Sequence, residues 1–321
     1  MPLHPQVRAF VDEAVAEGGP PLEEMSVLQA RSLDAGFIEL QAPAQEVADV
    51  RDVLVAGAAG LLPARVYHPS PGEALPMLCF FHGGGYVVGN IDVPDRPCRA
   101  IANAARCVVV SVGYRTGPET KFPGPVEDGY AAARWVSEHA TELGGVSGYL
   151  AIGGESAGGG LAAAVALMAR DRGEPSIDYQ VLIYPMLAPA RGTTFASYRE
   201  NGEGYLLTRA AMEWFWGHYL ARDSDGHHPY AAPVLAEDHA RLPRALVITA
   251  EYDPLRDEGI AYAEKLRAAA VDVEHLPYHG AIHGFLVMSG RMDHGLQVVD
   301  DVAVRLRADF ERHTSASGSS R

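Results

Sequence analysis

The sequence has few cysteines and no long apolar run. Only three cysteines occur in 321 residues, and this odd, sparse set argues against a disulfide framework and favours a reducing compartment. The first residues do not follow the pattern of a signal peptide, and no stretch reaches the roughly 18 apolar residues of a membrane span. We therefore expect a cytoplasmic protein that does not cross a membrane.

Clusters of basic residues are also missing. The formal net charge is −15, from 41 acidic and 26 basic residues. Nucleic acids and anionic membrane surfaces are bound through clustered Lys and Arg, so this balance disfavours both kinds of partner. The adjacent His227 and His228 resemble a metal-binding pair but have no suitably spaced carboxylate or cysteine. We expect no metal and no cofactor.

The fold class follows from the order of the apolar runs. Hydrophobic residues make up 48% of the chain, enough for a large core. Three strand-like runs come first, and from about residue 106 single apolar runs alternate with helical stretches. This order predicts an α/β fold with a mostly parallel, eight-stranded sheet covered by helices on both faces. The predicted strands lie within 47–55, 62–68, 76–82, 107–114, 149–154, 179–185, 244–253 and 271–279.

Two helical segments stand outside this alternation. Residues 1–45 contain helical patterns before any strand, and residues 187–222 combine a polar loop with an aromatic-rich helix. We expect the two segments to form a cap over a core made of residues 46–186 and 223–313. The polar residues 314–321 are expected to be a disordered tail.

The strongest chemical signal is the sequence Gly-Glu-Ser-Ala-Gly at residues 154–158. An apolar run enters it and an Ala-rich helix leaves it. This strand–turn–helix context is typical of a nucleophile elbow, where a serine occupies a strained turn and small neighbours let strand and helix pass closely. We predict that Ser156 is a nucleophile; the alternative is a glycine-rich turn without chemistry.

A second signal is the glycine run at residues 83–85, directly after His82 at a predicted strand end. Consecutive glycines allow several N–H groups to face one point, which suits an oxyanion hole. A phosphate-binding loop is the alternative, but no Lys-Ser/Thr pair follows as in nucleotide-binding loops. We expect His82 to order the loop by hydrogen bonding.

A carboxylate and a histidine complete the predicted site. Glu251, Asp257 and Glu258 are the alternatives for the acid, but Asp253 alone lies in the loop just beyond a predicted strand, whereas Asp257 and Glu258 fall within the next predicted helix. His283 lies in the loop after the last predicted strand. The order Ser, Asp, His is the one used by α/β-hydrolases, so we predict a triad of Ser156, Asp253 and His283.

The strings HGGGYVVG, GGESAGGGLA, DPLRDEG and HGF together resemble the hormone-sensitive-lipase-like esterases, the bacterial family IV carboxylesterases. The resemblance covers nearly the whole chain and is loosely closest to heroin-esterase-type bacterial enzymes. It implies an α/β-hydrolase fold with a helical cap, and often a homodimer. It also implies an oxyanion hole formed by the N–H groups of Gly84, Gly85 and Ala157, with Gly83 as a further contributor.

The predicted function is hydrolysis of short-to-medium-chain carboxylic esters through an acyl-enzyme. An amidase or lactonase with the same triad is the first alternative, and a non-catalytic ligand-binding member of the family is the second. The intact triad histidine argues against the non-catalytic reading. Apolar side chains near the motifs and in the cap are candidates for the substrate pocket, with helix core as their other reading: Tyr86, Tyr205, Leu206, Trp214, Phe215 and Phe285.

Overall fold

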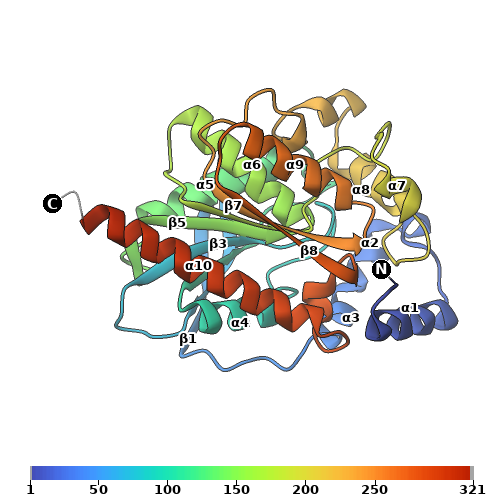
Figure 1. Ribbon diagram of the computed structural model, residues 1–321, viewed down its shortest axis with the longest axis horizontal. Coiled ribbons are helices and arrows are strands. Elements are labelled where there is room, and N and C mark those ends of the chain that lie inside the picture. The colour runs from blue at the N-terminus through green and yellow to red at the C-terminus, as the bar shows by residue number, and fades with distance from the viewer. Residues whose placement is uncertain (1, 319–321) are drawn as a thin grey trace.

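The computed structural model describes residues 2–318, in which one eight-stranded sheet lies between two layers of helices (Figure 1). The strand order is β1-β2-β4-β3-β5-β6-β7-β8. β1 and β2 pair antiparallel, β2 also pairs antiparallel with β4, and the remaining neighbours are parallel. The strands are β1 (Asp49–Gly57), β2 (Gly60–His68), β3 (Leu75–Phe81), β4 (Val108–Val112), β5 (Gly145–Glu155), β6 (Tyr179–Ile183), β7 (Arg244–Tyr252) and β8 (Val273–Ile282).

The central strands are continuous apolar runs because helices cover both of their faces. Every residue of β3 is buried. Its alternate side chains enter two separate cores: Cys79 and Phe81 face one helix layer, and Leu78 and Phe80 face the other. This two-sided burial confirms the predicted α/β class.

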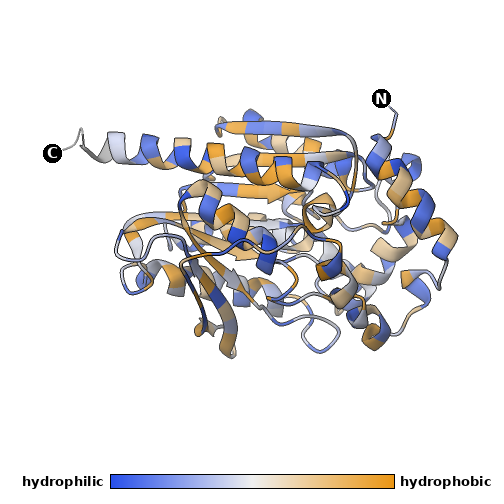
Figure 2. Ribbon diagram, turned by 90° about the horizontal axis from the view of Figure 1, so that it is seen from below, coloured by the Kyte–Doolittle hydropathy of each residue, from blue (hydrophilic) through white to orange (hydrophobic). Residues whose placement is uncertain are grey.

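One layer contains α5 (Gly124–Glu138), α6 (Ala157–Arg172) and α9 (Arg256–Ala268). The other contains α4 (Asp95–Ala105) and α10 (His294–Gly318). Hydrophilic and hydrophobic residues alternate along the long C-terminal helix α10, as expected for an element that places one side on the sheet (Figure 2), whereas α6 is buried from Ala157 to Ala169. No helix within residues 2–318 is long and apolar enough to cross a membrane. All three cysteines are buried and none is in a disulfide.

Most of the remaining helices gather at one end of the sheet, where the parallel strands end (Figure 1), while η3 packs on α6 and α9. The N-terminal group is α1 (Pro5–Glu17), η1 (Leu22–Glu24), α2 (Val27–Ser32) and α3 (Asp34–Glu39). The segment between β6 and β7 adds α7 (Ser197–Glu200), α8 (Arg209–Tyr219), η2 (Asp223–His227) and η3 (Pro233–Leu235). A further short helix, η4 (Phe285–Met288), follows β8.

The C-terminal end differs from the expectation of a tail that is disordered from residue 314. Helix α10 continues to Gly318, while residues 319–321 lie outside the described residues. The Thr314 and Ser315 hydroxyls both donate to the Glu311 carbonyl one turn earlier, at 3.0 and 2.8 Å. Such back-bonding lets small polar residues continue a helix that is already formed.

Candidate active site

The serine elbow joins β5 directly to α6. Ser156 has φ 56° and ψ −121°, a strained conformation for a residue with a side chain. A Cβ on Gly154 would overlap the Gly158 backbone, and one on Gly158 would overlap the Phe81 carbonyl oxygen. Both flanking glycines are therefore required by the close approach of strand and helix.

The three predicted triad residues come together at the ends of β5, β7 and β8. His283 Nε2 lies 2.9 Å from Ser156 Oγ, and His283 Nδ1 lies 2.7 Å from Asp253 Oδ2. Asp253 is fully buried, and its other carboxylate oxygen accepts the Leu255 N–H at 2.8 Å. The geometry matches a serine whose proton can pass to an imidazole that a buried carboxylate orients.

Tyr184 supports the histidine from below and has no counterpart in the sequence-based prediction. Its ring centroid lies 4.7 Å from that of His283, and its hydroxyl accepts the Leu286 N–H at 3.3 Å. Phe285, expected to bind substrate, packs instead against Tyr184 and Tyr278 and is fully buried. Both aromatic residues hold the histidine loop and do not face the cavity.

The glycine loop after β3 presents fewer free donors than expected. The Gly83 N–H donates to Glu155 Oε1 at 2.5 Å, which takes it away from the expected oxyanion hole. Within the described part of the chain, the N–H groups of Gly84 and Gly85 have no protein acceptor. Ala157 is the first residue of α6, where a backbone N–H has no intrahelical partner. These three N–H groups remain as candidate donors.

Sequence reasoning missed Glu155, the last residue of β5, which binds this loop. It occupies the variable position of the elbow motif, and its carboxyl is buried beside the serine. Burial raises its pKa, while the Gly83 N–H and the Tyr184 hydroxyl act in the opposite direction. No motif marks this position, because its partner lies 72 residues earlier in the chain.

His82 orders the loop, as expected. Its side chain is 1% exposed, its ring stacks on Tyr114 at 4.4 Å, and Nδ1 lies 2.7 Å from the Gly83 carbonyl oxygen. Burial lowers the pKa of His82 to about 4. The ring is therefore neutral near pH 7, and the contact to Gly83 is a donation from Nδ1–H.

A cavity of about 290 Å³ opens above Ser156. Its lining is mostly apolar, and its few charged or reactive side chains are those of Asp34, Glu155, Ser156 and His283. Leu206 and Phe215 line it, as expected. The other lining residues from the two capping segments are Leu22, Ala30, Leu33, Phe37, Leu207, Ala211 and Met212.

Three more of the expected pocket residues lie elsewhere. Tyr86 stacks on Tyr219 with ring centroids 4.0 Å apart, and Tyr205 packs on Tyr252 at 4.9 Å. Trp214 packs against His218 on its own helix. Helix α8 turns a different stripe of side chains toward the cavity, and residue type alone does not reveal which stripe that is.

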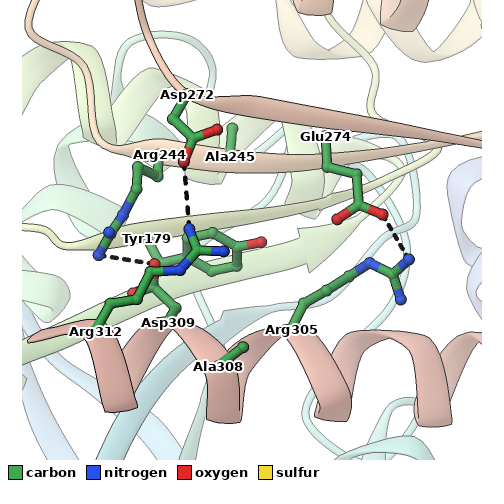
Figure 3. Close-up of a pocket in the computed structure, with 9 residues that line it drawn as sticks. All are labelled: Tyr179, Arg244, Ala245, Asp272, Glu274, Arg305, Ala308, Asp309 and Arg312. Carbon is green, nitrogen blue, oxygen red and sulfur yellow. Dashed lines mark hydrogen bonds and ion pairs between the residues drawn. The ribbon is translucent and has the colours of Figure 1, made fainter.

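A second hollow lies near the opposite end of the sheet, between β6, β7, β8 and α10 (Figure 3). Each arginine that lines it pairs with a carboxylate: Arg244 with Asp309, Arg305 with Glu274, and Arg312 with Asp272. This hollow is bridged by its own ion pairs, and its lining contains no serine, threonine, cysteine or histidine. The cavity above Ser156 is therefore the candidate active site.

Comparison with known proteins agrees with this geometry. A family model described as the α/β-hydrolase fold matches residues 78–287. Carboxylic ester hydrolase LipN of Mycobacterium tuberculosis is 44% identical over 250 residues, and esterase LipI of the same organism is 40% identical over 263. A solved structure, the hyperthermophilic esterase of Pyrobaculum calidifontis, superimposes with a TM-score of 0.91 at 40% identity. This chain belongs to the α/β-hydrolase family, among its hormone-sensitive-lipase-like carboxylesterases.

The extent of each match differs. The LipN alignment covers 74% of this chain and 64% of LipN, so the chain spans less than two thirds of that relative. The LipI alignment covers 80% of this chain and 81% of LipI. The archaeal esterase covers 96% of this chain, which covers 99% of the esterase in return. The capping segments of this α/β-hydrolase therefore fall within the structural match.

Proposed function

We propose that this chain hydrolyses carboxylic esters with Ser156 as nucleophile, His283 as base and acid, and Asp253 as the carboxylate that orients the imidazole. The observation that carries the proposal is the pair of contacts at His283, 2.9 Å to Ser156 Oγ and 2.7 Å to Asp253 Oδ2. They lie at the base of an apolar cavity, where an uncharged ester can reach the hydroxyl.

The proposed mechanism has two halves. His283 Nε2 takes the Ser156 proton as Oγ attacks the ester carbonyl, and the oxyanion receives hydrogen bonds from the N–H groups of Gly84, Gly85 and Ala157. His283 then protonates the leaving alcohol, and an acyl-enzyme remains. Water, deprotonated by the same imidazole, attacks the acyl group, releases the carboxylic acid and restores the serine.

We also propose that the substrates have short-to-medium acyl chains, of about four to eight carbons. Two separate capping segments contribute to the apolar lining of the cavity, so each additional methylene buried there gains about 0.8 kcal/mol until the space is full. Longer chains then meet steric resistance from the lining. Specificity should therefore rise and fall along an acyl series.

The test is kcat/KM for nitrophenyl esters from acetate to palmitate, with a matched nitroanilide as the amide counterpart. We expect a maximum between about four and eight carbons and much slower anilide turnover. A phosphonate that reacts with activated serines should modify Ser156 alone. Modification of another residue, or a steady rise to palmitate, would contradict the assignment of nucleophile or pocket.

Two further proposals concern location and assembly. Three buried thiols without a disulfide support a reducing, cytoplasmic location. The family resemblance supports a homodimer. Sedimentation equilibrium of the purified chain tests the second proposal, and a single monomeric species at micromolar concentration would refute it.

A further inference from the structure

A buried asparagine connects one capping segment to the triad. Asn201 follows α7 in the segment between β6 and β7, and its side chain is 5% exposed. Its Nδ2 donates to two backbone carbonyl oxygens, those of Glu251 and Asp253, each at 3.2 Å. One of the two acceptors therefore belongs to the triad carboxylate residue itself.

These two carbonyls lie where the chain leaves the sheet. The pairing of β7 with β8 becomes irregular just before Tyr252, so regular strand bonds do not continue to Asp253. Buried carbonyl oxygens need donors, and Arg256 supplies one to each: its N–H at 3.1 Å from Asp253 and Nη1 at 3.3 Å from Glu251. The Asn201 amide supplies the second donor to both and bridges the chain on either side of Tyr252.

Ser197, four residues before Asn201, binds the other side of the same loop. Its Oγ donates to the Pro254 carbonyl at 2.7 Å, and its N–H donates to Asp257 Oδ2 at 2.8 Å. The Asn201 N–H in turn donates to the Ser197 carbonyl at 2.8 Å. One helical turn therefore presents both side chains to residues 251–257.

The segment that follows leads into the cavity wall. Tyr205 packs on Tyr252, and the next residue, Leu206, lines the cavity. Glu200 also pairs with Arg256 at 2.8 Å. The capping segment therefore contacts residues 251–257 through side chains that lie only a few residues before Leu206 in the cavity lining.

We propose that Asn201 is a positioning residue for ester hydrolysis, which fixes the direction in which the Asp253 carboxylate leaves the sheet toward His283. The inference depends on the proposed triad. The carboxylate has two partners, the Leu255 N–H and His283, and neither restrains the backbone that carries it from the side of the cap. A displacement of about 1 Å at a catalytic group lowers rates on the order of 100-fold, so a bridge at this backbone controls kcat.

The test compares Asn201→Ala and Asn201→Asp with the wild-type chain on nitrophenyl butyrate. Asn201→Asp preserves the shape but replaces the two N–H donors of the amide with at most one carboxyl proton, so the two carbonyl oxygens cannot both be bound. For both variants we expect kcat to fall about 10- to 100-fold with KM within about threefold, because substrate contacts are untouched.

Asn103→Ala is the matched control. The Asn103 side-chain amide donates to the Glu46 carbonyl and to the Gln45 side chain on the exposed surface of the core. The Asn103→Ala substitution therefore also removes an amide that is bound to backbone. Its kinetic constants should equal those of the wild type. Phosphonate titration of active sites corrects every rate for the fraction of folded enzyme.

Other results would overturn the inference. A wild-type kcat per titrated site in Asn201→Ala, even with a lower melting temperature, would mean that Asn201 only stabilises the fold. A loss confined to KM would place its effect on the pocket. If Asn201→Ala does not fold, Asn201→Asp provides the same test, and an unchanged kcat per titrated site in that variant is decisive against the bridge. The proposed function fails separately, if the wild type does not hydrolyse the ester or Ser156 is not labelled.

Discussion

The site has a polar floor and an apolar roof, and they are built by different rules. The floor consists of the triad and the glycine loop, all at the ends of neighbouring parallel strands. Its side chains are fixed by short hydrogen bonds such as those at His283. The roof comes from η1, α2, α3, α8 and the residues next to them, and apart from Asp34 it meets the cavity through alanine, leucine, methionine and phenylalanine side chains. The floor decides which bond breaks, and the roof decides which molecule fits.

The largest expected effect is on the floor. Ser156→Ala removes the attacking oxygen and should lower kcat by roughly three to six orders of magnitude. The fold should be retained, because Ala fits the same backbone and its neighbours are unchanged. Circular dichroism and steady-state rates on nitrophenyl butyrate measure both quantities. Activity within tenfold of the wild type would mean that another residue is the nucleophile.

The second-largest effect tests whether the contact between the glycine loop of the floor and helix α8 of the roof influences catalysis. Gly85 has φ 59°, and a Cβ there would overlap the Phe215 ring of α8. Gly85→Ala should displace the loop and lower kcat/KM about 100-fold, the scale of losing one oxyanion donor. Phe215→Ala, added to it, should restore about tenfold by removing the overlap. If the double variant recovers nothing, the strained backbone and not the roof contact causes the loss.

Most of the residues that form the floor could be predicted from the sequence. The elbow, the glycine run and the two later motifs each lie within a few residues, and the α/β order places the ends of their strands at one edge. What it missed depends on partners far apart in sequence. Nothing local shows that Glu155 binds the Gly83 N–H, or that Asn201 reaches the carbonyl of Asp253.

The roof could be predicted less well, for a physical reason. An aromatic residue next to a motif serves equally well as core or as lining, and packing decides between them. Tyr86 and Phe285 both adjoin motifs, yet both are fully buried beneath the site. The lining residues Ala30, Leu33 and Phe37 follow a helical spacing. This apolar stripe is visible in the sequence, and because it lies outside the helices that cover the sheet, it could have been predicted to face the cavity.

A smaller effect concerns the stability of the floor. Because the pKa of His82 falls to about 4 in the folded chain, the unfolded chain binds a proton below about pH 6.5 that the folded chain does not. The contribution of neutral His82 to the free energy of unfolding is therefore fully present above pH 6.5, and about 3 kcal/mol of it is lost as pH falls to 4. His82→Asn should remove this loss while its amide still donates to the Gly83 carbonyl.

Urea unfolding at pH 7, 5.5 and 4 measures the difference. Loss of stacking on Tyr114 should make His82→Asn less stable than the wild type at pH 7, but its stability should change less on acidification. His227→Asn, at an exposed histidine, is the control. Parallel pH dependence in His82→Asn and the wild type would mean that His82 does not account for the acid loss.

The smallest effect belongs to the roof alone. Met212 is buried on α8 and lines the cavity, whereas Trp214 on the same helix does not. Met212→Ala should lengthen the space for the acyl chain, and each further methylene accommodated is worth about 0.8 kcal/mol, or about fourfold in kcat/KM. The optimum should move to longer esters by one or two carbons, with acetate hydrolysis changed less than about threefold. Trp214→Ala should leave the optimum where it is. The measurement is kcat/KM across the nitrophenyl series, and an equal shift in both variants would mean that the helix as a whole, not its lining side chains, sets the acyl preference.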